Sequence, residues 1–294
     1  MCNERFYAVS AFRLGFCSTA RAVFSKKLGT SDGGKRGFCK TQAELFFFAA
    51  VMVFVFNAKE MCLPSAETLA LGIMYGIFTV LAQWMYTVAL GKMSVSVCAM
   101  VFSFGFIIPT VFGTIVWNEN IGLFKIISVL LCVVTIIFSS FGTDCNGKKA
   151  ERGAILPLVV SMTASGGLGV VQKLQQRSAY PSETAPFLLS AFLLAGTISA
   201  VAALSLKAKD SAGQKHGRNF YFSVVTVGTA MAAANTANTL LAGRLPSIIV
   251  FPVTNVGVIL ASLAVSVLFL KEKITARQIA AVFTGIAAVI MFNF

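Results

Sequence analysis

Long apolar stretches separated by short polar breaks fill almost the whole sequence. Most of them are about 20 residues long, the length at which an α-helix crosses a hydrocarbon core of about 30 Å. They do not alternate apolar and polar residues, which argues against membrane-spanning strands. The pattern predicts ten transmembrane helices, over residues 6–24, 42–58, 67–90, 94–117, 121–141, 153–174, 186–206, 219–241, 245–270 and 275–294.

The second half of the chain repeats the first half in altered form. An offset of 152 positions pairs Gln83 with Asn235, Tyr86 with Asn238, Ser103 with Asn255 and Gly105 with Gly257. Five apolar segments are therefore followed by five more, and the predicted domains are residues 1–147 and 148–294. Because each repeat holds an odd number of helices, the second is inverted relative to the first. The predicted fold class is an all-α membrane protein built from two inverted five-helix repeats.

Composition supports a membrane protein and changes the meaning of the net charge. Hydrophobic residues make up 57% of the chain and charged residues 12%, and the mean hydropathy is +0.82. A soluble domain of this size would have too little polar surface. The net charge of +13 is dispersed among short loops. No basic face for nucleic acid is therefore expected, and the bilayer is the predicted surrounding of the chain.

The lysines and arginines are distributed unequally between the two predicted sides of the membrane. Sixteen of them fall in or beside the loops that follow helices 1, 3, 5, 7 and 9, and six fall on the opposite side. By the positive-inside rule, the first set is cytoplasmic. Both termini are then predicted to be extracytoplasmic, and the loops at 25–42 and 207–218 cytoplasmic.

The side chains needed for common catalytic and metal sites are missing from the predicted spans. The one histidine, His216, falls in a loop, and the acidic residues fall in loops or at helix ends. The seven cysteines lack the spacing of metal or redox motifs. We therefore expect no enzyme activity, no metal and no cofactor.

Uncharged polar side chains do recur at bilayer depth. Asn235 and Asn238 are three residues apart and share a helix face, and Gln83 and Tyr86 repeat that spacing in the first half. Ser103 and Asn255 add a second pair of equivalent positions, and we predict that these six residues line a substrate-binding cavity. The competing interpretation is that amides and hydroxyls hydrogen-bond the helices together, which is the commoner role for Ser and Thr.

Arg13 falls near the middle of the first predicted helix, with no acidic residue at the same depth. A guanidinium at that depth is costly. Its side chain either extends to the membrane surface or faces a watery cavity, where it would bind a carboxylate or phosphate of the substrate. We include it among the candidate substrate-binding residues.

Two similar hairpins end the two repeats, IVWNENIG in the first and LFLKEKIT in the second, and the latter is followed by the small-residue helix ARQIAAVFTGIAAVIMF. This unit resembles the EamA-like members of the drug/metabolite transporter superfamily. The resemblance implies a ten-helix secondary transporter with a central cavity, which usually exports small metabolites such as amino acids. The small multidrug resistance relatives use a membrane glutamate that has no match here, so antiport of cationic drugs by that route is not expected.

The leading hypothesis is a secondary transporter, working as an exporter, that moves a small polar metabolite by alternating access between the two repeats. A flippase, or a flippase subunit, for a lipid-linked headgroup is a second hypothesis, and a non-transporting membrane assembly partner is a third. The expected partners are a small-molecule substrate and the lipid bilayer, in a bacterial cytoplasmic membrane. The sequence gives no indication of the oligomeric state.

Overall fold

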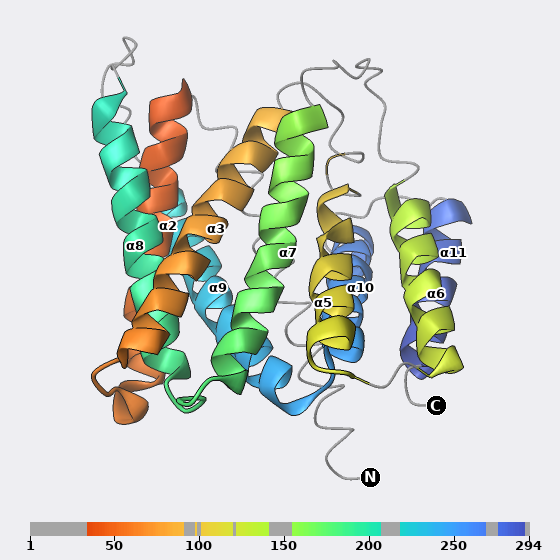
Figure 1. Cartoon of the computed structure of the whole chain (residues 1–294). Helices are drawn as coiled ribbons and strands as arrows, with labels where there is room; N and C mark the ends of the chain where they lie inside the picture. The colour runs from red at the N-terminus through yellow and green to blue at the C-terminus, as the bar shows by residue number, and fades with distance from the viewer. Residues whose placement is uncertain are drawn as a thin grey trace. The chain divides into compact units, whose positions relative to one another are not determined.

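The computed structural model of the chain describes residues 34–90, 98, 101–119, 122–140, 155–206, 218–268 and 276–291. In these residues every regular element is helical (Figure 1). The elements are α2 (Gly34–Phe56), η1 (Ala58–Glu60), α3 (Ala66–Leu90), η2 (Phe104–Phe106), α5 (Ile107–Val116), α6 (Leu123–Ser140), α7 (Ile155–Arg177), α8 (Thr184–Ser205), α9 (Arg218–Arg244), α10 (Ser247–Leu268) and α11 (Ala276–Met291).

Nine of the ten predicted spans overlap helical segments, and the first, at 6–24, lies outside the described residues. The loop predicted at 25–42 is wrong in its second half, because α2 begins at Gly34 and runs into the span predicted at 42–58. The span predicted at 94–117 is not one continuous α-helix. The short 3-10 helix η2 precedes α5, in which Pro109 is the third residue. Proline has no backbone N–H, and its ring clashes with the carbonyl four residues earlier, here that of Gly105. The irregular turn at η2 is therefore where that carbonyl escapes the clash.

Four of the described helices are long and apolar enough to cross a membrane, over Arg36–Phe56, Ala66–Ala89, Ile155–Arg177 and Thr184–Ser205. Shorter apolar helical segments lie at Val101–Val116, Leu123–Phe138, Ser247–Gly257 and Ile279–Ala288, and the third of them is the first half of α10. Helix α9 is absent from both groups although it has 27 residues. Its carboxyl half contains the sequence NTANT, so polar side chains lower its hydropathy.

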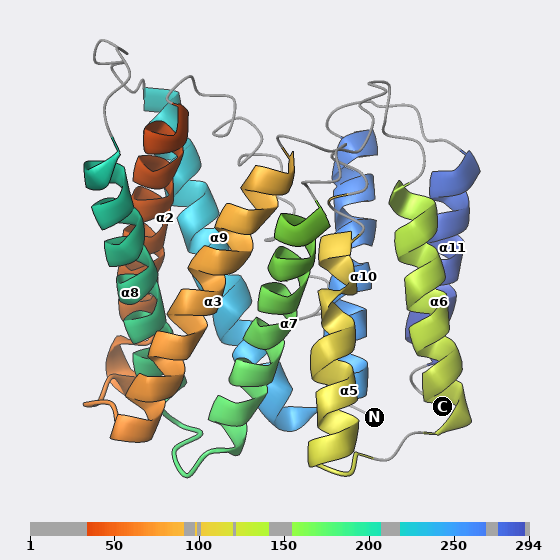
Figure 2. The same cartoon turned by 45° about the horizontal axis from the view of Figure 1, so that its top comes forward.

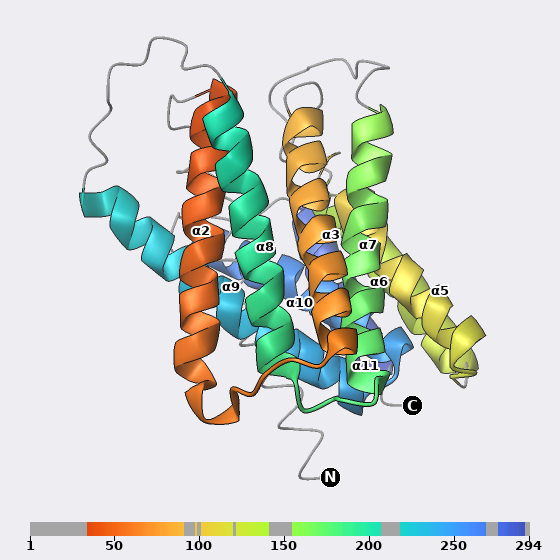
Figure 3. The same cartoon turned by 60° about the vertical axis from the view of Figure 1, so that its left-hand side comes forward.

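The chain divides into two compact units, and α3, α7 and α9 contribute residues to both. Unit 2 consists of residues 17–80 and 174–240. Within it α2 packs along α8 (Figure 3), where the rings of Phe46 and Phe192 stack with their centroids 6.5 Å apart. The amino-terminal part of α3 also approaches α8 closely. A Cβ atom at Gly76 would lie 2.7 Å from the Ala191 carbonyl oxygen, so only glycine fits there.

Unit 1 consists of residues 1–16, 81–173 and 241–294. Within it α6 packs along α11, and α10 packs against α5 (Figure 2). The hydroxyls of Thr135 and Thr284 join α6 to α11 through a hydrogen bond of 3.0 Å. Each unit contains segments from both halves of the sequence. The repeat boundary between residues 147 and 148 describes the duplication and stays a prediction.

Candidate functional site

A polar cluster occupies the carboxyl half of α9 inside unit 2. The phenol of Tyr75, from α3, donates a hydrogen bond of 2.6 Å to Oδ1 of Asn235. The Asn235 amide nitrogen donates in turn to the Met231 carbonyl at 2.8 Å. Asn235 and Asn238 are three residues apart on one helical face. We use the name α9 cluster for Tyr75, Asn235, Thr236 and Asn238.

Two side chains of the α9 cluster contain buried polar atoms without a hydrogen-bond partner. These atoms are Oγ1 of Thr236 and Oδ1 of Asn238. A buried polar atom left unpaired costs roughly 1–3 kcal/mol, and such an atom in a native protein calls for an explanation such as a ligand or water. Thr236 and Asn238 are two residues apart and therefore lie on different faces of α9. Oδ1 of Asn238 is thus the unpaired acceptor on the face that Asn235 occupies.

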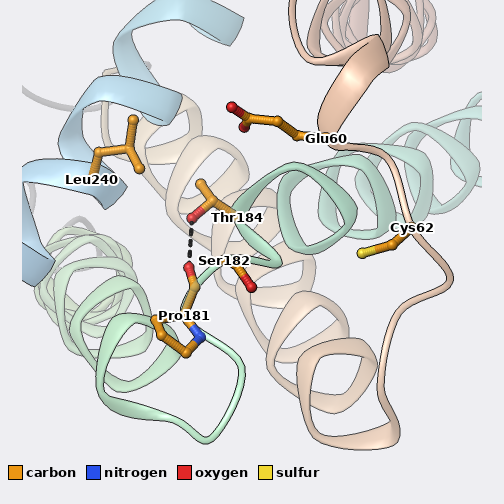
Figure 4. Close-up of a pocket in the computed structure, with 6 residues that line it drawn as sticks. All are labelled: Glu60, Cys62, Pro181, Ser182, Thr184 and Leu240. Carbon is orange, nitrogen blue, oxygen red and sulfur yellow. Dashed lines mark hydrogen bonds between the residues drawn. The ribbon is translucent and has the colours of Figure 1, made fainter.

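A pocket of about 430 Å³ opens in the same unit. Its lining residues are Glu60, Cys62, Pro181, Ser182, Thr184 and Leu240 (Figure 4). Thr184 begins α8, and the fully buried Phe187 follows it by one helical turn. The Phe187 ring meets the ring of Tyr75 edge-on at 5.3 Å. One aromatic contact thus connects the pocket wall to the tyrosine that binds Asn235.

The other candidate residues are distributed as follows. Gln83, Tyr86, Ser103 and Asn255 belong to unit 1, whereas Asn235 and Asn238 belong to unit 2. Tyr86 packs against Phe102, with 5.0 Å between the ring centroids. Asn255 donates to the Phe251 carbonyl of its own helix at 2.9 Å. Arg13 lies outside the described residues, and a single cavity lined by all seven stays a prediction.

The sequence repeat is matched by a repeated hydrogen bond. The hydroxyl of Thr87 donates to the Gln83 carbonyl, and the hydroxyl of Thr239 donates to the Asn235 carbonyl, both at 2.8 Å. Both members of one pair lie 152 positions after those of the other. Threonines elsewhere in these helices, such as Thr79 and Thr226, make the same bond to the carbonyl four residues earlier, so the match shows helix at both positions and the repeat stays a prediction.

Unit 1 contains a buried ion pair that the sequence did not indicate. Nζ of Lys173 lies 3.0 Å from Oε1 of Glu119, and their side chains are only 1% and 6% exposed. The Lys173 ammonium also donates to the Leu245 carbonyl at 2.7 Å. The Glu119 carboxylate accepts from the backbone N–H of Ser247 at 2.6 Å. Glu119 stands out in the sequence as the acid of the WNEN break, but nothing local points to Lys173 as its partner.

A second carboxylate, Glu183, binds the start of α3 in unit 2. It accepts hydrogen bonds from the backbone N–H of Ser65 at 2.9 Å and from the Ser65 hydroxyl at 2.8 Å. A hydrogen bond from the Thr68 side chain and those from Ser65 lower the pKa of Glu183, although burial acts in the opposite direction. The charge is also favourable beside the positive end of a helix dipole.

The long apolar helices with their buried polar side chains define an all-α membrane protein. The chain belongs to a family of membrane transporters, because the family model described as "Sugar transport protein" matches residues 21–293. One solved structure, described as "Crystal structure of protein", is similar with a TM-score of 0.81, covering 98% of this chain and 96% of that one. Its 11% identity means that the similarity shows the fold alone. No curated protein matches the chain.

Proposed function

We propose that this protein is a secondary transporter for a small, uncharged solute rich in hydroxyl groups, with a sugar as the simplest example. The observation that carries this proposal is the polar face of the α9 cluster, where Tyr75 binds Asn235 and Oδ1 of Asn238 is buried without a partner. A solute bound at this face would supply the missing hydrogen bond. The proposal makes the protein a non-enzymatic carrier that works by alternating access.

The chemistry of the cluster favours a neutral solute. Its polar groups are a phenol, two carboxamides and a hydroxyl, which donate and accept hydrogen bonds but carry no charge. A charged solute would lose its hydration without gaining a counter-charge from these four residues. Sugar hydroxyls both donate and accept, so one of them can donate to the unpaired Oδ1 of Asn238. The family description, sugar transport protein, agrees with this choice.

The pocket of unit 2, which Leu240 of α9 helps to line, is our candidate for the mouth of the solute path. Its volume of about 430 Å³ lies within the range of roughly 300–1,000 Å³ that is usual for small-molecule sites. Ser182 and Thr184 add hydroxyls to its lining. The edge-on contact of Phe187 with Tyr75, and the bond of Tyr75 to Asn235, link the helix that carries Thr184 to the α9 cluster.

The finer assignments rest on the resemblance to the EamA-like family. It favours export as the direction of transport and a bacterial cytoplasmic membrane as the location. It also suggests amino acids as substrates, which would use Arg13 as the partner of their carboxylate. The neutral site formed by the α9 cluster favours sugars over amino acids.

A solute-exchange screen in proteoliposomes tests the proposal. Vesicles that contain the purified protein are loaded with neutral monosaccharides, zwitterionic amino acids or organic anions, and exchange of the matching radiolabelled solute is measured against protein-free vesicles. We expect exchange of at least one monosaccharide. Exchange confined to amino acids or anions would overturn the neutral-solute proposal and favour a substrate site that includes Arg13. Exchange of none of the three classes would favour the hypothesis of a non-transporting assembly partner.

A further inference from the structure

The buried ion pair of unit 1 encloses the corner where α9 ends and α10 begins. Helix α9 ends at Arg244 and α10 begins at Ser247. Lys173 binds the Leu245 carbonyl on one side of this corner, and Glu119 binds the Ser247 N–H on the other. The cation therefore lies at the negative end of one helix and the anion at the positive end of the next, where each is favoured.

The pair also joins three segments that are separate in the sequence. Glu119 lies in the loop after α5, Lys173 lies near the end of α7, and the corner leads into α10. Gly113 permits this approach, since a Cβ atom there would lie 2.6 Å from the Ser247 side chain and 2.9 Å from Oε2 of Glu119. The Trp117 ring centroid lies 6.0 Å from the Lys173 ammonium. A buried charge pair is therefore among the contacts that hold these three segments together.

The far end of α7 is held differently. Leu158, fifteen residues before Lys173, forms a buried apolar cluster with Ala89 and Cys98. At 1.5 Å per residue, the two groups are about 22 Å apart along α7. An apolar cluster is stabilised by exclusion of water, whereas a charge pair loses most of its strength once water enters. One end of α7 is therefore held by a buried ion pair, and the other end is held by apolar packing.

We infer that Glu119 and Lys173 form a gate that opens when their charges separate and releases the α9–α10 corner. This inference rests on the proposed transport function. It assigns the pair to the side of the membrane that the charge distribution predicts as extracytoplasmic. The corner continues α9, and Asn238 of the α9 cluster lies seven residues before Leu245. Release of the corner therefore acts on the helix that carries the candidate site.

A purely stabilising role accounts less well for the pair. Buried ion pairs are on average no better for stability than apolar side chains of similar size. An apolar closure is used at the other end of the same helix, so charge is not required for packing here. What a charge pair adds is a contact that water can break.

Two accessibility readouts test the gate without any solute, so their result does not depend on which solute is carried. The Trp84→Phe background leaves Trp117 as the only tryptophan, since the chain has two, and quenching of its fluorescence by iodide reports access to the gate. Alkylation of Cys98, resolved by peptide mass spectrometry, reports access to the apolar end, with the buried Cys132 as an internal control. The variants are Glu119→Gln, Lys173→Met and the double variant, with Glu67→Gln and Lys59→Met as exposed controls.

A gate requires the two readouts to move in opposite directions. In Glu119→Gln we expect Trp117 quenching to rise and Cys98 alkylation to fall by about tenfold, because breaking the buried pair favours the state open at the gate. The double variant, which leaves no buried charge unpaired, should remain open although its thermal stability recovers. Unchanged quenching would overturn the inference. So would a joint rise of quenching and of Cys98 and Cys132 alkylation, which would mean that the pair only stabilises the fold.

The wild type and every variant could fail to exchange solute while Trp117 quenching and Cys98 alkylation still move in opposite directions. That result would support the gate and reject the proposed solute. Normal exchange by the wild type, without opposite movement of the two readouts, would support the proposed solute and reject the gate. The two proposals therefore fail separately.

Discussion

The ammonium group of Lys173 and the carboxylate of Glu119 lie 3.0 Å apart, and both side chains are almost fully buried in unit 1. Lys173 also donates to the Leu245 carbonyl, and Glu119 accepts from both the N–H and the hydroxyl of Ser247. Replacing either charged side chain by a neutral one, while the other charge stays buried, should therefore destabilise the fold.

The ion pair predicts unequal costs for its two neutral variants. Glu119→Gln leaves a buried ammonium without its anion, which costs about 3–5 kcal/mol of unfolding free energy. Lys173→Met should cost less, because the Glu119 carboxylate keeps its bond to the start of α10 and the favourable helix dipole. The double variant should lie closest to the wild type. Reversible unfolding in detergent measures all three, and a double variant as unstable as Glu119→Gln would contradict this account.

The repeated amides predict a loss of transport that precedes a loss of folding. Gln83 and Asn235 are equivalent in the two repeats, and each has a carbonyl bonded by a threonine hydroxyl four residues later. We expect that either residue changed to Ala lowers solute exchange in proteoliposomes well before it lowers the yield of folded protein. Thr197→Ala on α8 is the control, since its exposed hydroxyl bonds a carbonyl of its own helix. Normal exchange in both amide variants would assign the amides to helix packing.

Glu183 predicts a loss of stability on acidification. Because its pKa is lowered in the folded protein, its contribution is fully present above the ordinary value of 4.5 and is lost as the pH falls through the folded value. Glu183→Gln should therefore melt below the wild type at pH 7, and the gap should shrink as the pH falls below 4.5. Melting temperatures in detergent across this range measure it, with Glu67→Gln as the exposed control. A gap that is independent of pH would contradict the assignment.

Arg13 predicts a separation of stability from function. For an anionic or zwitterionic solute, the alternative to the neutral solute proposed above, we expect Arg13→Lys to keep partial transport, since the cation remains but the planar fork is lost. Arg13→Gln should abolish that transport while membrane insertion is unchanged or improved. The pair of measurements is thermal stability and uptake into liposomes. Wild-type uptake by Arg13→Gln would show that the side chain only reaches the membrane surface.

The helices themselves are largely readable from the sequence. The predicted span 67–90 corresponds to α3 (Ala66–Leu90), and 186–206 corresponds to α8 (Thr184–Ser205). Hydropathy predicts such helices well because crossing a bilayer requires every residue in the span to be compatible with hydrocarbon, which is a local property. The sequence does not predict the 3-10 turn at η2. A proline near the start of a helix does not by itself show which backbone conformation will keep its ring away from the carbonyl four residues earlier.

The contacts within the candidate site and the gate depend on tertiary structure. Tyr75 and Asn235 are 160 residues apart, and only Asn235 had been singled out by the repeat. Lys173 lies in the last turn of a predicted span, where a lysine is ordinarily explained by the membrane surface. Its burial follows from the approach of Glu119 and the α9–α10 corner, which no periodicity in α7 encodes.

The transported solute binds the face of α9 that Asn235 and Asn238 share, and a pair of variants two residues apart on this helix tests this claim most directly. Asn238→Leu removes the unpaired acceptor of that face with little change of shape, whereas Thr236→Val removes an unpaired hydroxyl on a different face. The measurement is the rate of exchange of a radiolabelled monosaccharide in proteoliposomes. We predict a loss of about tenfold for Asn238→Leu, as expected for one lost hydrogen bond to a bound solute, and little change for Thr236→Val. Equal rates in the two variants, at equal folded yield, would contradict the claim.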